Sequence, residues 1–379
     1  MEIIFAFIAV KKLLLKNVGF LLKHINMFDF SKKLAFGMDL SDASLKIVQF
    51  KESAGNFFMS NFIKCDIPSG IVEGGVVEKE DELVSIFKKA FIKPNGLPFK
   101  GREVICSLPE EKIFIRVIQL PKMKKEELSN AIKWEAEAHI PLSIDEVYLG
   151  WQIIDNIENL DHFDILIAAT PKEIIDKYLS FLRKVNLIPI AFEPESLSVV
   201  RSLMKKDDSN PTIIVDLGAT GTNFVIFSAS AIRFTSHTDI SGNLFNQEIM
   251  KEMKVSKEKA NQLKVKFGLN NTKEGEKVYK VINPIIDDLT KQIKDYIGYY
   301  REHDSHIHSK KKDISQIILC GGDSHLLKLP EAINSKLNLP VKLGCPMVNV
   351  VNNKESQLMS KKELLAYATS IGLALRQIT

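Results

Sequence analysis

The chain has 379 residues, a formal net charge of +4 and 45% hydrophobic residues. This length is enough for two or more domains. So small a net charge gives no electrostatic reason to expect nucleic-acid binding. The four cysteines (Cys65, Cys106, Cys320 and Cys345) show no C-x-x-C spacing, so neither a disulfide framework nor a zinc site is predicted, and a reducing compartment is expected.

The N-terminal segment carries the whole net charge, because its lysines outnumber its acids while the rest of the chain is neutral. The uncharged run Ile3–Val10 is far shorter than the roughly 18 residues that cross a membrane. Two interpretations of residues 1–26 stay open. They form a basic amphipathic segment that touches an anionic membrane surface, or an extension upstream of a true start at Met27.

Hydrophobic periodicity in the first half predicts alternating strands and helices. The strands are expected at 34–50 (a hairpin), 57–65, 103–107, 113–119, 148–154, 163–170 and 187–192. The helices are expected at 79–90, 124–139, 172–185 and 197–204. A turn-rich segment at 67–77 and a Pro/Gly loop at 93–101 connect some of them.

The polar run Lys205–Pro211 is the clearest linker in the chain and predicts a domain boundary. Beyond it, strands are expected at 213–217, 224–227, 231–237, 314–319 and 341–343. Helices are expected at 242–253, 256–266, 277–303, from 324 to about 337, and as one closing helix at 361–378.

Two hairpins with the same layout stand about 180 residues apart. In the second, an apolar strand ends in the acid Asp216, a turn of small residues follows, and Asn223 ends that turn before the return strand. In the first, Asp39 and Lys46 hold the corresponding places, also seven residues apart. Small residues let a phosphate approach backbone N–H donors. Either hairpin alone could be an ordinary turn, but the repeat suggests two halves that bind one polyphosphate.

Several stretches together resemble the PilM family of type IV pilus assembly proteins, within the actin/Hsp70/FtsA superfamily. The matching stretches are Gly37–Lys46, Pro121–Met123 with Ala131–Pro141, Asp216–Asn223, Leu319–Gly322 and Ile371–Arg376. They cover the chain from about Met27 to its end. The stretch around Ala131–Pro141 is the most specific, since it separates this family from the wider superfamily.

The resemblance implies an actin-like, ribonuclease H-like α/β fold of two lobes with an ATP cleft between them. Lobe 1 would comprise 27–67, 164–211 and 362–379, with an inserted FtsA-type subdomain at 68–163. Lobe 2 would comprise 212–243 and 314–361, with a helical subdomain at 244–313.

The resemblance also implies a set of ATP-binding residues. They are Asp39, Ser41, Ala43, Ser44 and Lys46 in the first turn, Asp216, Gly218, Ala219, Thr220, Gly221 and Asn223 in the second, and Gly242, Asn261, Lys264, Gly321, Gly322 and Ser324 beyond it. Asp39 and Asp216 would hold Mg²⁺ through water, since Mg²⁺ tends to keep several of its waters.

Two departures from the family pattern bear on activity. Ser41 replaces a glycine, so a hydroxyl crowds the first turn. Asn261 replaces a glutamate that reaches toward the ribose, while Lys264 remains. The resemblance therefore implies ATP binding more than rapid hydrolysis. Glu193 is the one candidate for a water-activating base, and a structural loop acid is the alternative.

Other sites find less support in the sequence. His303, His306 and His308 with Asp304 suggest a metal site, but the lysines at 310–312 would oppose a cation. Glu135 lies in the apolar stripe of the helix at 124–139, where an edge carboxylate is the simpler interpretation. No Walker A or Rossmann glycine motif is present in the sequence.

By resemblance, the chain is expected to be an ATP-binding scaffold of pilus assembly in the cytoplasm, at the inner face of the cell membrane. Its partners would be the N-terminal cytoplasmic peptide of a PilN-type membrane protein, bound beside 68–163, and other pilus assembly platform proteins. Further copies of itself are a possible partner, and no nucleic acid is expected. The alternatives are an FtsA-like, filament-forming division protein and a small-molecule kinase of the same superfamily.

Overall fold

The structure, a computed structural model, describes residues 34–53, 56–92, 95–96, 98–155, 161–302, 313–350 and 359–378. The predictions for residues 1–26 and for the histidines at 303–308 lie outside the described residues. The chain divides into two compact units. Unit 1 holds the residues up to Ser198 and those from Thr369 onward, and unit 2 holds Val199–Asn349 and Met359–Ala368.

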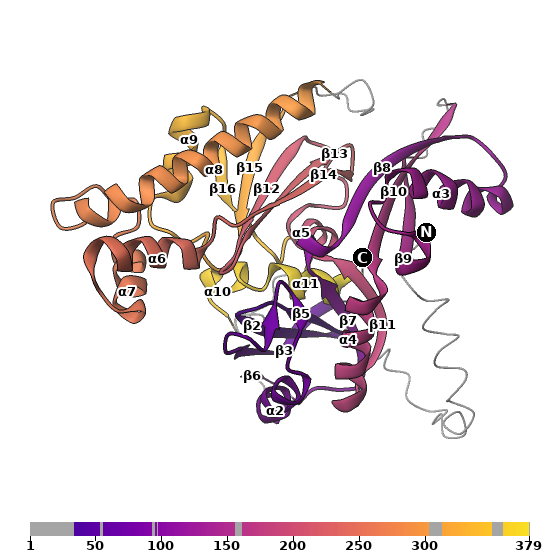
Figure 1. Cartoon of the computed structure of the whole chain (residues 1–379), viewed down its shortest axis with the longest axis horizontal. Helices are drawn as coiled ribbons and strands as arrows, with labels where there is room; N and C mark the ends of the chain where they lie inside the picture. The colour runs from indigo at the N-terminus through magenta and orange to yellow at the C-terminus, as the bar shows by residue number, and fades with distance from the viewer. Residues whose placement is uncertain are drawn as a thin grey trace. The chain divides into compact units, whose positions relative to one another are not determined.

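The centre of unit 1 is a six-stranded sheet in the order β11-β7-β1-β2-β3-β6 (Figure 1). Its strands are β1 (Phe36–Leu40), β2 (Ser44–Ser53), β3 (Asn56–Asp66), β6 (Asn95–Gly96), β7 (Glu103–Leu108) and β11 (Ile188–Pro194). Strands β1, β2 and β3 form an antiparallel meander, and β7 and β11 run parallel to β1. The carboxyl ends of three parallel strands therefore meet at one edge, beside the β1–β2 turn.

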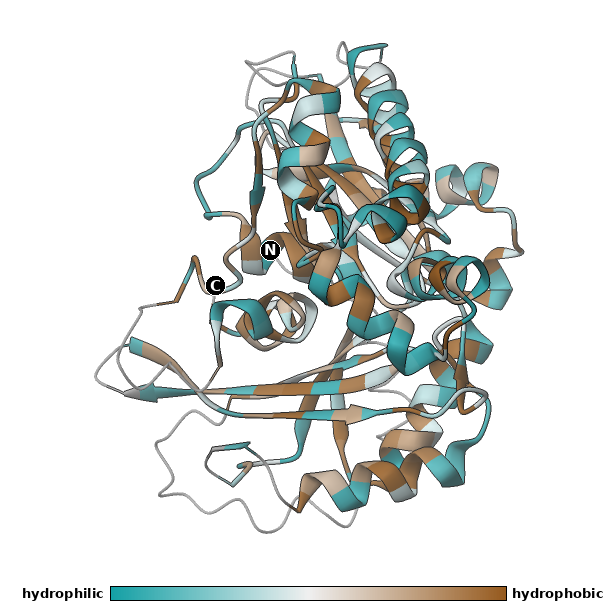
Figure 2. Ribbon diagram, turned by 90° about the vertical axis from the view of Figure 1, so that its left-hand side faces the viewer, coloured by the Kyte–Doolittle hydropathy of each residue, from teal (hydrophilic) through white to brown (hydrophobic). Residues whose placement is uncertain are grey.

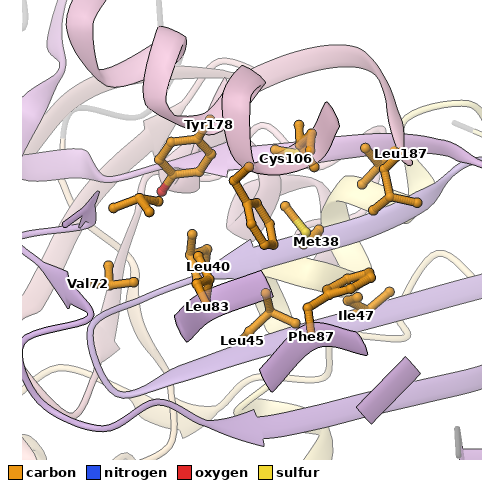
Figure 3. Close-up of a cluster of buried hydrophobic side chains, with 14 of the residues drawn as sticks. Met38, Leu40, Leu45, Ile47, Val72, Leu83, Phe87, Cys106, Tyr178 and Leu187 are labelled. Carbon is orange, nitrogen blue, oxygen red and sulfur yellow. The ribbon is translucent and has the colours of Figure 1, made fainter. Parts of the chain in front are cut away.

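Helices cover both faces of this sheet. On one face, α2 (Glu80–Phe91) and α4 (Lys172–Lys184) pack on alternate residues of β1 and β2, and Figure 3 shows Phe87, Tyr178 and Met38 in this core. On the other face, Leu373 of α11 (Ala368–Leu375) packs against Ala35, Ile105 and Ala191. Alternation along each strand thus separates a large apolar core from a thinner layer under α11.

A second sheet of unit 1, in the order β8-β10-β9, stands apart from the first. It consists of β8 (Phe114–Pro121), β9 (Val147–Asp155) and β10 (His162–Pro171), and α3 (Lys125–His139) packs on one face through Leu128, Ile132 and Ala136. Glu135 of α3 contacts His139 at 3.1 Å, one turn along the helix, as expected for an acid at the edge of the stripe.

The predicted inserted subdomain at 68–163 is therefore too wide. Strand β7 lies between β1 and β11 in the main sheet, and α2 packs on that sheet's core. Between them, β4 (Val72–Glu73) and β5 (Val76–Val77) form a small hairpin. The separate sheet with α3 spans only 114–171. Sequence periodicity identified β7 to β10 but does not reveal which sheet each one joins, and it gave no sign of β4 and β5, which lie in the segment expected to be turns.

Unit 2 is built on a five-stranded sheet in the order β14-β13-β12-β15-β16. Its strands are β12 (Thr212–Leu217), β13 (Thr222–Ser228), β14 (Ala231–Thr238), β15 (Gln316–Cys320) and β16 (Val341–Leu343). Strands β12, β13 and β14 are an antiparallel meander, and β15 and β16 run parallel to β12 and to each other. This is the layout of β3-β2-β1-β7-β11 in unit 1, so the repeat predicted from the two hairpins is confirmed.

Three helices pack on one face of this sheet, and a fourth lies beside them. The three helices on the sheet are α6 (Gly242–Met253), α8 (Glu276–Glu302) and α9 (Leu329–Leu337). The fourth, α7 (Lys257–Phe267), lies beside α6. Helix α8 places Ile282, Ile286, Leu289 and Ile293 in the core at helical spacing. Figure 2 shows that the helices carry both hydrophobic residues, in brown, and hydrophilic residues, in teal.

Three predicted boundaries differ from the structure. The helix expected from 324 begins only at Leu329, the first residue of α9. The expected closing helix at 361–378 is two helices, α10 (Lys361–Leu365) and α11, because Tyr367 N donates to Leu364 O in a tight turn that ends α10. The two helices also belong to different units. The border between units falls within α5 (Glu195–Leu203), ahead of the predicted linker.

In the described part of the chain, no helix is long and apolar enough to cross a membrane.

Candidate functional site

The first turn joins β1 to β2 and is held by the Asp39 carboxylate. Asp39 lies opposite Lys46 across the antiparallel pair, and Lys46 Nζ donates to Asp39 Oδ2 at 3.0 Å. Ser107 Oγ, at the end of β7, donates to Asp39 Oδ1 at 3.2 Å. The side chains of Lys46 and Asp39 are only 13% and 7% exposed. The turn thus contains a nearly buried ion pair that balances the charge of the acid.

Ser41 closes this turn on itself. Its backbone N–H and its Oγ both donate to Ser44 O, at 2.9 and 3.1 Å. The hydroxyl expected to crowd the turn therefore makes hydrogen bonds within it. Ala43 O accepts from Ile67 N at 3.0 Å, which fixes the other side of the turn to the end of β3.

Asp42 attaches the same turn to the β4–β5 hairpin. Its two carboxylate oxygens accept from Gly74 N at 3.0 Å and Gly75 N at 2.7 Å. Both glycines have positive φ, and a Cβ on Gly75 would lie 2.3 Å from the Pro109 side chain. Tyr178 Oη donates to Gly75 O at 2.9 Å, and burial raises the pKa of this phenol well above its usual value, so it stays a donor.

The second turn, in unit 2, repeats the first with different side chains. Asp216 lies opposite Asn223 across β12 and β13, and Gly218 N donates to Gly221 O at 2.9 Å. Nδ1 of His237, on β14, donates to Asn223 Oδ1 at 2.7 Å. Where unit 1 has a lysine opposite its acid, unit 2 has a neutral amide.

Cys320 ends β15 and lies opposite Asp216, and Ser107, the last residue but one of β7, lies beside Asp39. Burial, and then the nearby Asp216 carboxylate that the thiol hydrogen-bonds, raise the pKa of Cys320 well above its usual value. The thiol is therefore a neutral donor to Asp216. In both units a strand-end acid accepts from a neutral group on the neighbouring parallel strand.

The start of α6 binds the second turn through backbone groups. Gly242 N donates to Gly218 O at 3.0 Å, and Asn243 N donates to Ala219 O at 2.9 Å. Ser241 caps the helix, since its side chain accepts from Leu244 N. Thr220, at the tip of the turn, is exposed. These contacts fix the turn without covering its tip.

The segment after β15 packs against the same turn. Gly321 has φ +88°, and a Cβ there would lie 2.4 Å from Asp216 Oδ1, so this position requires glycine. Ser324 is buried and its Oγ donates to Gly321 O at 2.7 Å, while Gly322 is exposed. Asp323 N donates to Leu217 O at 3.1 Å.

Lys264 on α7 reaches this segment. Its Nζ donates to Asp323 Oδ1 at 2.6 Å and to Gly242 O at 3.2 Å, and its side chain is 6% exposed. Asn261, one turn earlier on α7, is exposed. Unit 2 therefore brings together the second turn, the start of α6, Lys264 and the 321–324 segment.

A model of the family described as type IV pilus assembly protein PilM matches residues 37–378 of the chain. The chain belongs to the PilM family. Its fold is also similar to a chain of the PilM–PilN type IV pilus biogenesis complex, with a TM-score of 0.76 and 22% identity over 91% of this chain and 98% of that one.

More distant relatives share the fold of PilM. MreB5 of Spiroplasma citri bound to AMPPNP has a TM-score of 0.53 and 11% identity, over 92% of this chain and 97% of that one. The cell division protein FtsA of Buchnera aphidicola is 25% identical over 199 residues, and the alignment spans 47% of each sequence, about half the length of that curated relative. The fold is thus the actin-like α/β fold of two lobes.

The residues of this PilM-family chain suit a nucleotide with Mg²⁺ in one respect. Among the described residues, no cluster of three or more His, Cys, Asp or Glu side chains could hold a metal directly. One acid in each unit, Asp39 and Asp216, stands at a strand end beside a turn with backbone donors. Each of these carboxylates, taken within its own unit, suits a hydrated Mg²⁺ that is contacted through water.

Glu193 does not fit the role of water-activating base that its position suggested. Its side chain is 0% exposed, Oε2 accepts from Arg376 at 2.9 Å, and Oε1 accepts from Ser198 Oγ at 2.9 Å. A base needs access to water and a free lone pair. The carboxylate instead forms a buried ion pair that connects β11 to the end of α11, so the structural alternative is the better one.

Four residues of the site escaped the sequence analysis. Ser107, Asp42, His237 and Asp323 each bind a predicted site residue or its turn. Asp42 and Asp323 carried a signal, because each stands between two predicted site residues, Asp42 between Ser41 and Ala43 and Asp323 between Gly322 and Ser324. The contacts of the other two depend on which strands become neighbours.

Proposed function

We propose that this PilM-family chain is an ATP-binding scaffold of type IV pilus assembly, and that it binds the N-terminal cytoplasmic peptide of a PilN-type membrane protein. The observation that carries the proposal is the family match over residues 37–378. The similarity to a chain of the PilM–PilN complex over 91% of the sequence supports the choice of partner. The scaffold would act in the cytoplasm, at the inner face of the cell membrane.

The nucleotide part of the proposal rests on the two turns. Backbone donors and Lys46 would bind phosphate oxygens, and Asp39 and Asp216 would hold Mg²⁺ through water. The Mg²⁺ would neutralise phosphate charge. The AMPPNP bound to the MreB5 relative supports a nucleotide in this fold. Because Glu193 is buried in an ion pair, we propose that ATP stabilises one arrangement of the lobes and is turned over slowly or not at all.

Thermal shift with Mg·ATP tests this part. The wild-type chain should melt at a higher temperature with Mg·ATP than without it, since a ligand that binds only the folded state stabilises it. Asp39→Ala and Asp216→Ala should each lose most of that shift, whereas Asp313→Ala, which removes an acid with a 70% exposed side chain, should keep it. The absence of a shift in the wild-type chain would contradict nucleotide binding.

We place the peptide on the β8-β10-β9 sheet, on the face opposite α3. Leu197 of α5 covers this face at Ala168. Further along the strands, Val117 stays partly exposed beside Leu166, its neighbour in register. Because β8 and β9 are the outer strands of this sheet, an extended peptide could pair with a strand edge and pack apolar side chains on Val117 and Leu166.

A pair of charge substitutions tests this surface. Val117→Glu should weaken binding of a synthetic PilN N-terminal peptide by about tenfold or more, because it puts a charge on the apolar face. Lys133→Glu, on the exposed side of α3, should leave the affinity unchanged. Circular dichroism would show that both variants fold. Equal affinities for the two variants would contradict this placement.

The FtsA similarity supports one alternative, an FtsA-like cell-division protein, for which the superfamily resemblance implies filament formation. Sedimentation with Mg·ATP distinguishes it, because a filament would pellet and a monomeric or small oligomeric scaffold would not. The other alternative, a small-molecule kinase, has less support, because Glu193, its one candidate base, is buried in an ion pair. Other platform proteins and copies of this chain remain possible further partners, and a membrane contact through residues 1–26 remains an expectation.

A further inference from the structure

The amino ends of β1, β7 and β11 lie at the sheet edge opposite the β1–β2 turn, because these three strands are parallel. Hydrogen bonds join the segments at this edge. Gln49 Nε2 donates to Leu34 O at 3.1 Å and to Lys100 O at 2.6 Å. Ile188 N donates to Arg102 O at 2.8 Å. The start of β1, the segment before β7 and the start of β11 are therefore neighbours.

The carboxyl end of α2 reaches the same edge, since α2 lies beside β3 in the same sheet (Figure 1). Phe91, the last residue of α2, stacks on Phe99 with 4.7 Å between the ring centroids. Phe99 in turn lies 5.6 Å from the ring of Phe36, the first residue of β1. Ile92, which follows α2, is 76% exposed, and Ile188 is 45% exposed. Two aliphatic side chains are thus open to water at this edge.

Cations surround these two isoleucines. Arg102 Nη1 donates to Asn186 Oδ1 at 3.1 Å, which brings Arg102 to the turn that follows α4. Of the acids nearby, Glu52 stands next to Lys51 in the chain, which leaves Glu103. We define the basic corner as Lys88, Lys89, Ile92, Lys100, Arg102, Arg183 and Ile188.

The positive charge of the basic corner is not balanced within the fold. Among the residues that the structure describes, Lys88, Lys89 and Lys100 form no ion pair, and all three are exposed. The last two turns of α2 contain no acid, because the acids of this helix stand in its first turn. The corner therefore attracts anionic partners.

The sequence before β1 carries charge of the same sign. Residues 1–33 directly precede Leu34 and hold six lysines against Glu2 and Asp29. The same segment is rich in aliphatic and aromatic residues. This combination of cations and apolar side chains is typical of sequences that bind at anionic membrane surfaces. The basic corner and the segment joined to it thus have the same chemical character.

We propose that the basic corner docks on an anionic phospholipid surface. Its lysines and arginines contact headgroup phosphates, while Ile92 and Ile188 enter the boundary between headgroups and acyl chains. The exposed aliphatic side chains favour this partner over a nucleic acid, whose backbone is bound through polar and charged contacts. The inference goes beyond the nucleotide and the peptide of the proposed function and depends on neither.

Co-sedimentation of the full chain with vesicles tests this surface. The wild-type chain should bind vesicles of phosphatidylcholine with about 30% phosphatidylglycerol and should not bind phosphatidylcholine alone. Lys88→Gln with Lys89→Gln should lower the partition coefficient about tenfold or more, because each lysine near an anionic surface contributes to binding. Lys88→Arg with Lys89→Arg keeps the charge and should bind as the wild-type chain does.

The matched control removes the same charge from another part of unit 1. Lys124→Gln with Lys133→Gln replaces two exposed lysines of the α3 region and should keep wild-type binding. Equal losses in the two double-glutamine variants would show that net charge alone drives binding, and would overturn the proposal.

The apolar part of the surface has its own variant. Ile92→Ser leaves the charge unchanged and should weaken vesicle binding about threefold or more, because it removes an aliphatic side chain that leaves water on docking. Unchanged binding by Ile92→Ser would refute the entry of this side chain into the membrane boundary.

Two further results would overturn the proposal. Wild-type binding by Lys88→Gln with Lys89→Gln would assign the membrane contact to another part of the chain, such as residues 1–33. No binding of the wild-type chain to anionic vesicles would leave the corner to an acidic protein partner. Neither result affects the proposed function, because titrations of Mg·ATP and of the PilN peptide into the same variants test it separately.

Discussion

Glu193 and Arg376 form a buried ion pair between β11 and the end of α11, with Glu193 at 0% and Arg376 at 18% exposure. Glu193→Gln should lower the free energy of unfolding by about 3 kcal/mol, because it leaves a buried guanidinium without its counter-charge. Urea denaturation measures this loss. Asp313→Asn, which breaks the exposed pair with Arg301, should cost less than about 1 kcal/mol.

The same variant separates the two roles considered for Glu193. A structural carboxylate predicts lower stability with nucleotide affinity largely kept in the folded fraction. If Glu193→Gln kept its stability and abolished a measurable ATP hydrolysis, the carboxylate would be a base, contrary to the present assignment.

The four cysteines differ sharply in burial, and this gives a second prediction. Cys65, Cys106 and Cys320 are buried and Cys345 is exposed. Burial raises the pKa of Cys65 to about 11 and that of Cys106 and Cys320 further, so these thiols do not ionise near neutral pH. One thiol should therefore react rapidly with Ellman's reagent at pH 8, and three more should react only in denaturant. Rapid reaction of more than one would contradict the burial of the strand ends.

At the scale of elements, α11 depends on two glycines for its close packing. A Cβ on Gly37 of β1 would lie 2.1 Å from Ser370 O of α11, and a Cβ on Gly372 of α11 would lie 1.8 Å from Ser198 O of α5. At either position, a residue larger than glycine would force the neighbouring helix backbone to move. These glycines fix α11 on the face of the sheet that carries Asp39 and Glu193.

Gly37→Ala should therefore lower the free energy of unfolding by about 3 kcal/mol or more. Gly298→Ala is the matched control, because nothing lies within 4 Å of its added Cβ in α8. The control should raise stability by about 1 kcal/mol through helix propensity. Chemical denaturation measures the free energy of unfolding of both variants. If the two substitutions changed it by similar amounts, the close approach of α11 to β1 would be refuted.

The β4–β5 hairpin holds the first turn through the Asp42 carboxylate and the N–H groups of Gly74 and Gly75. Asp42→Ala removes both charge-assisted hydrogen bonds and should cost about 2 kcal/mol. It should also weaken Mg·ATP binding, because the first turn loses one of its anchors. Unchanged stability and affinity would show that the hairpin does not position this turn.

At the scale of the whole molecule, the sequence was most informative where local pattern determines structure. The two hairpins share an acid, small turn residues and a polar residue seven positions later, so their repeat was predictable, and the matching sheet orders of the two units confirm it. Most strands and helices followed from periodicity. The family resemblance then gave the fold, which the family match and the structural relatives bear out.

The contacts that could not be predicted from the sequence join residues that are far apart along the chain. Nothing near Ser107 indicates that β7 lies beside β1, and this neighbour relation brings the hydroxyl to Asp39 and moves β7 out of the predicted insertion. Glu193 directly follows the predicted strand at 187–192, a place that suits a base, and its contact with Arg376, 183 residues later, shows a structural role. The Lys264–Asp323 pair likewise joins two segments 59 residues apart.

The binding of a synthetic PilN N-terminal peptide to the full chain tests the central claim most directly. Isothermal titration calorimetry should show saturable binding of one peptide per chain with a Kd in the micromolar range or tighter, and a scrambled peptide of the same composition should not bind. No heat of binding for the native peptide at millimolar concentration, or equal binding of the scrambled one, would contradict the scaffold assignment.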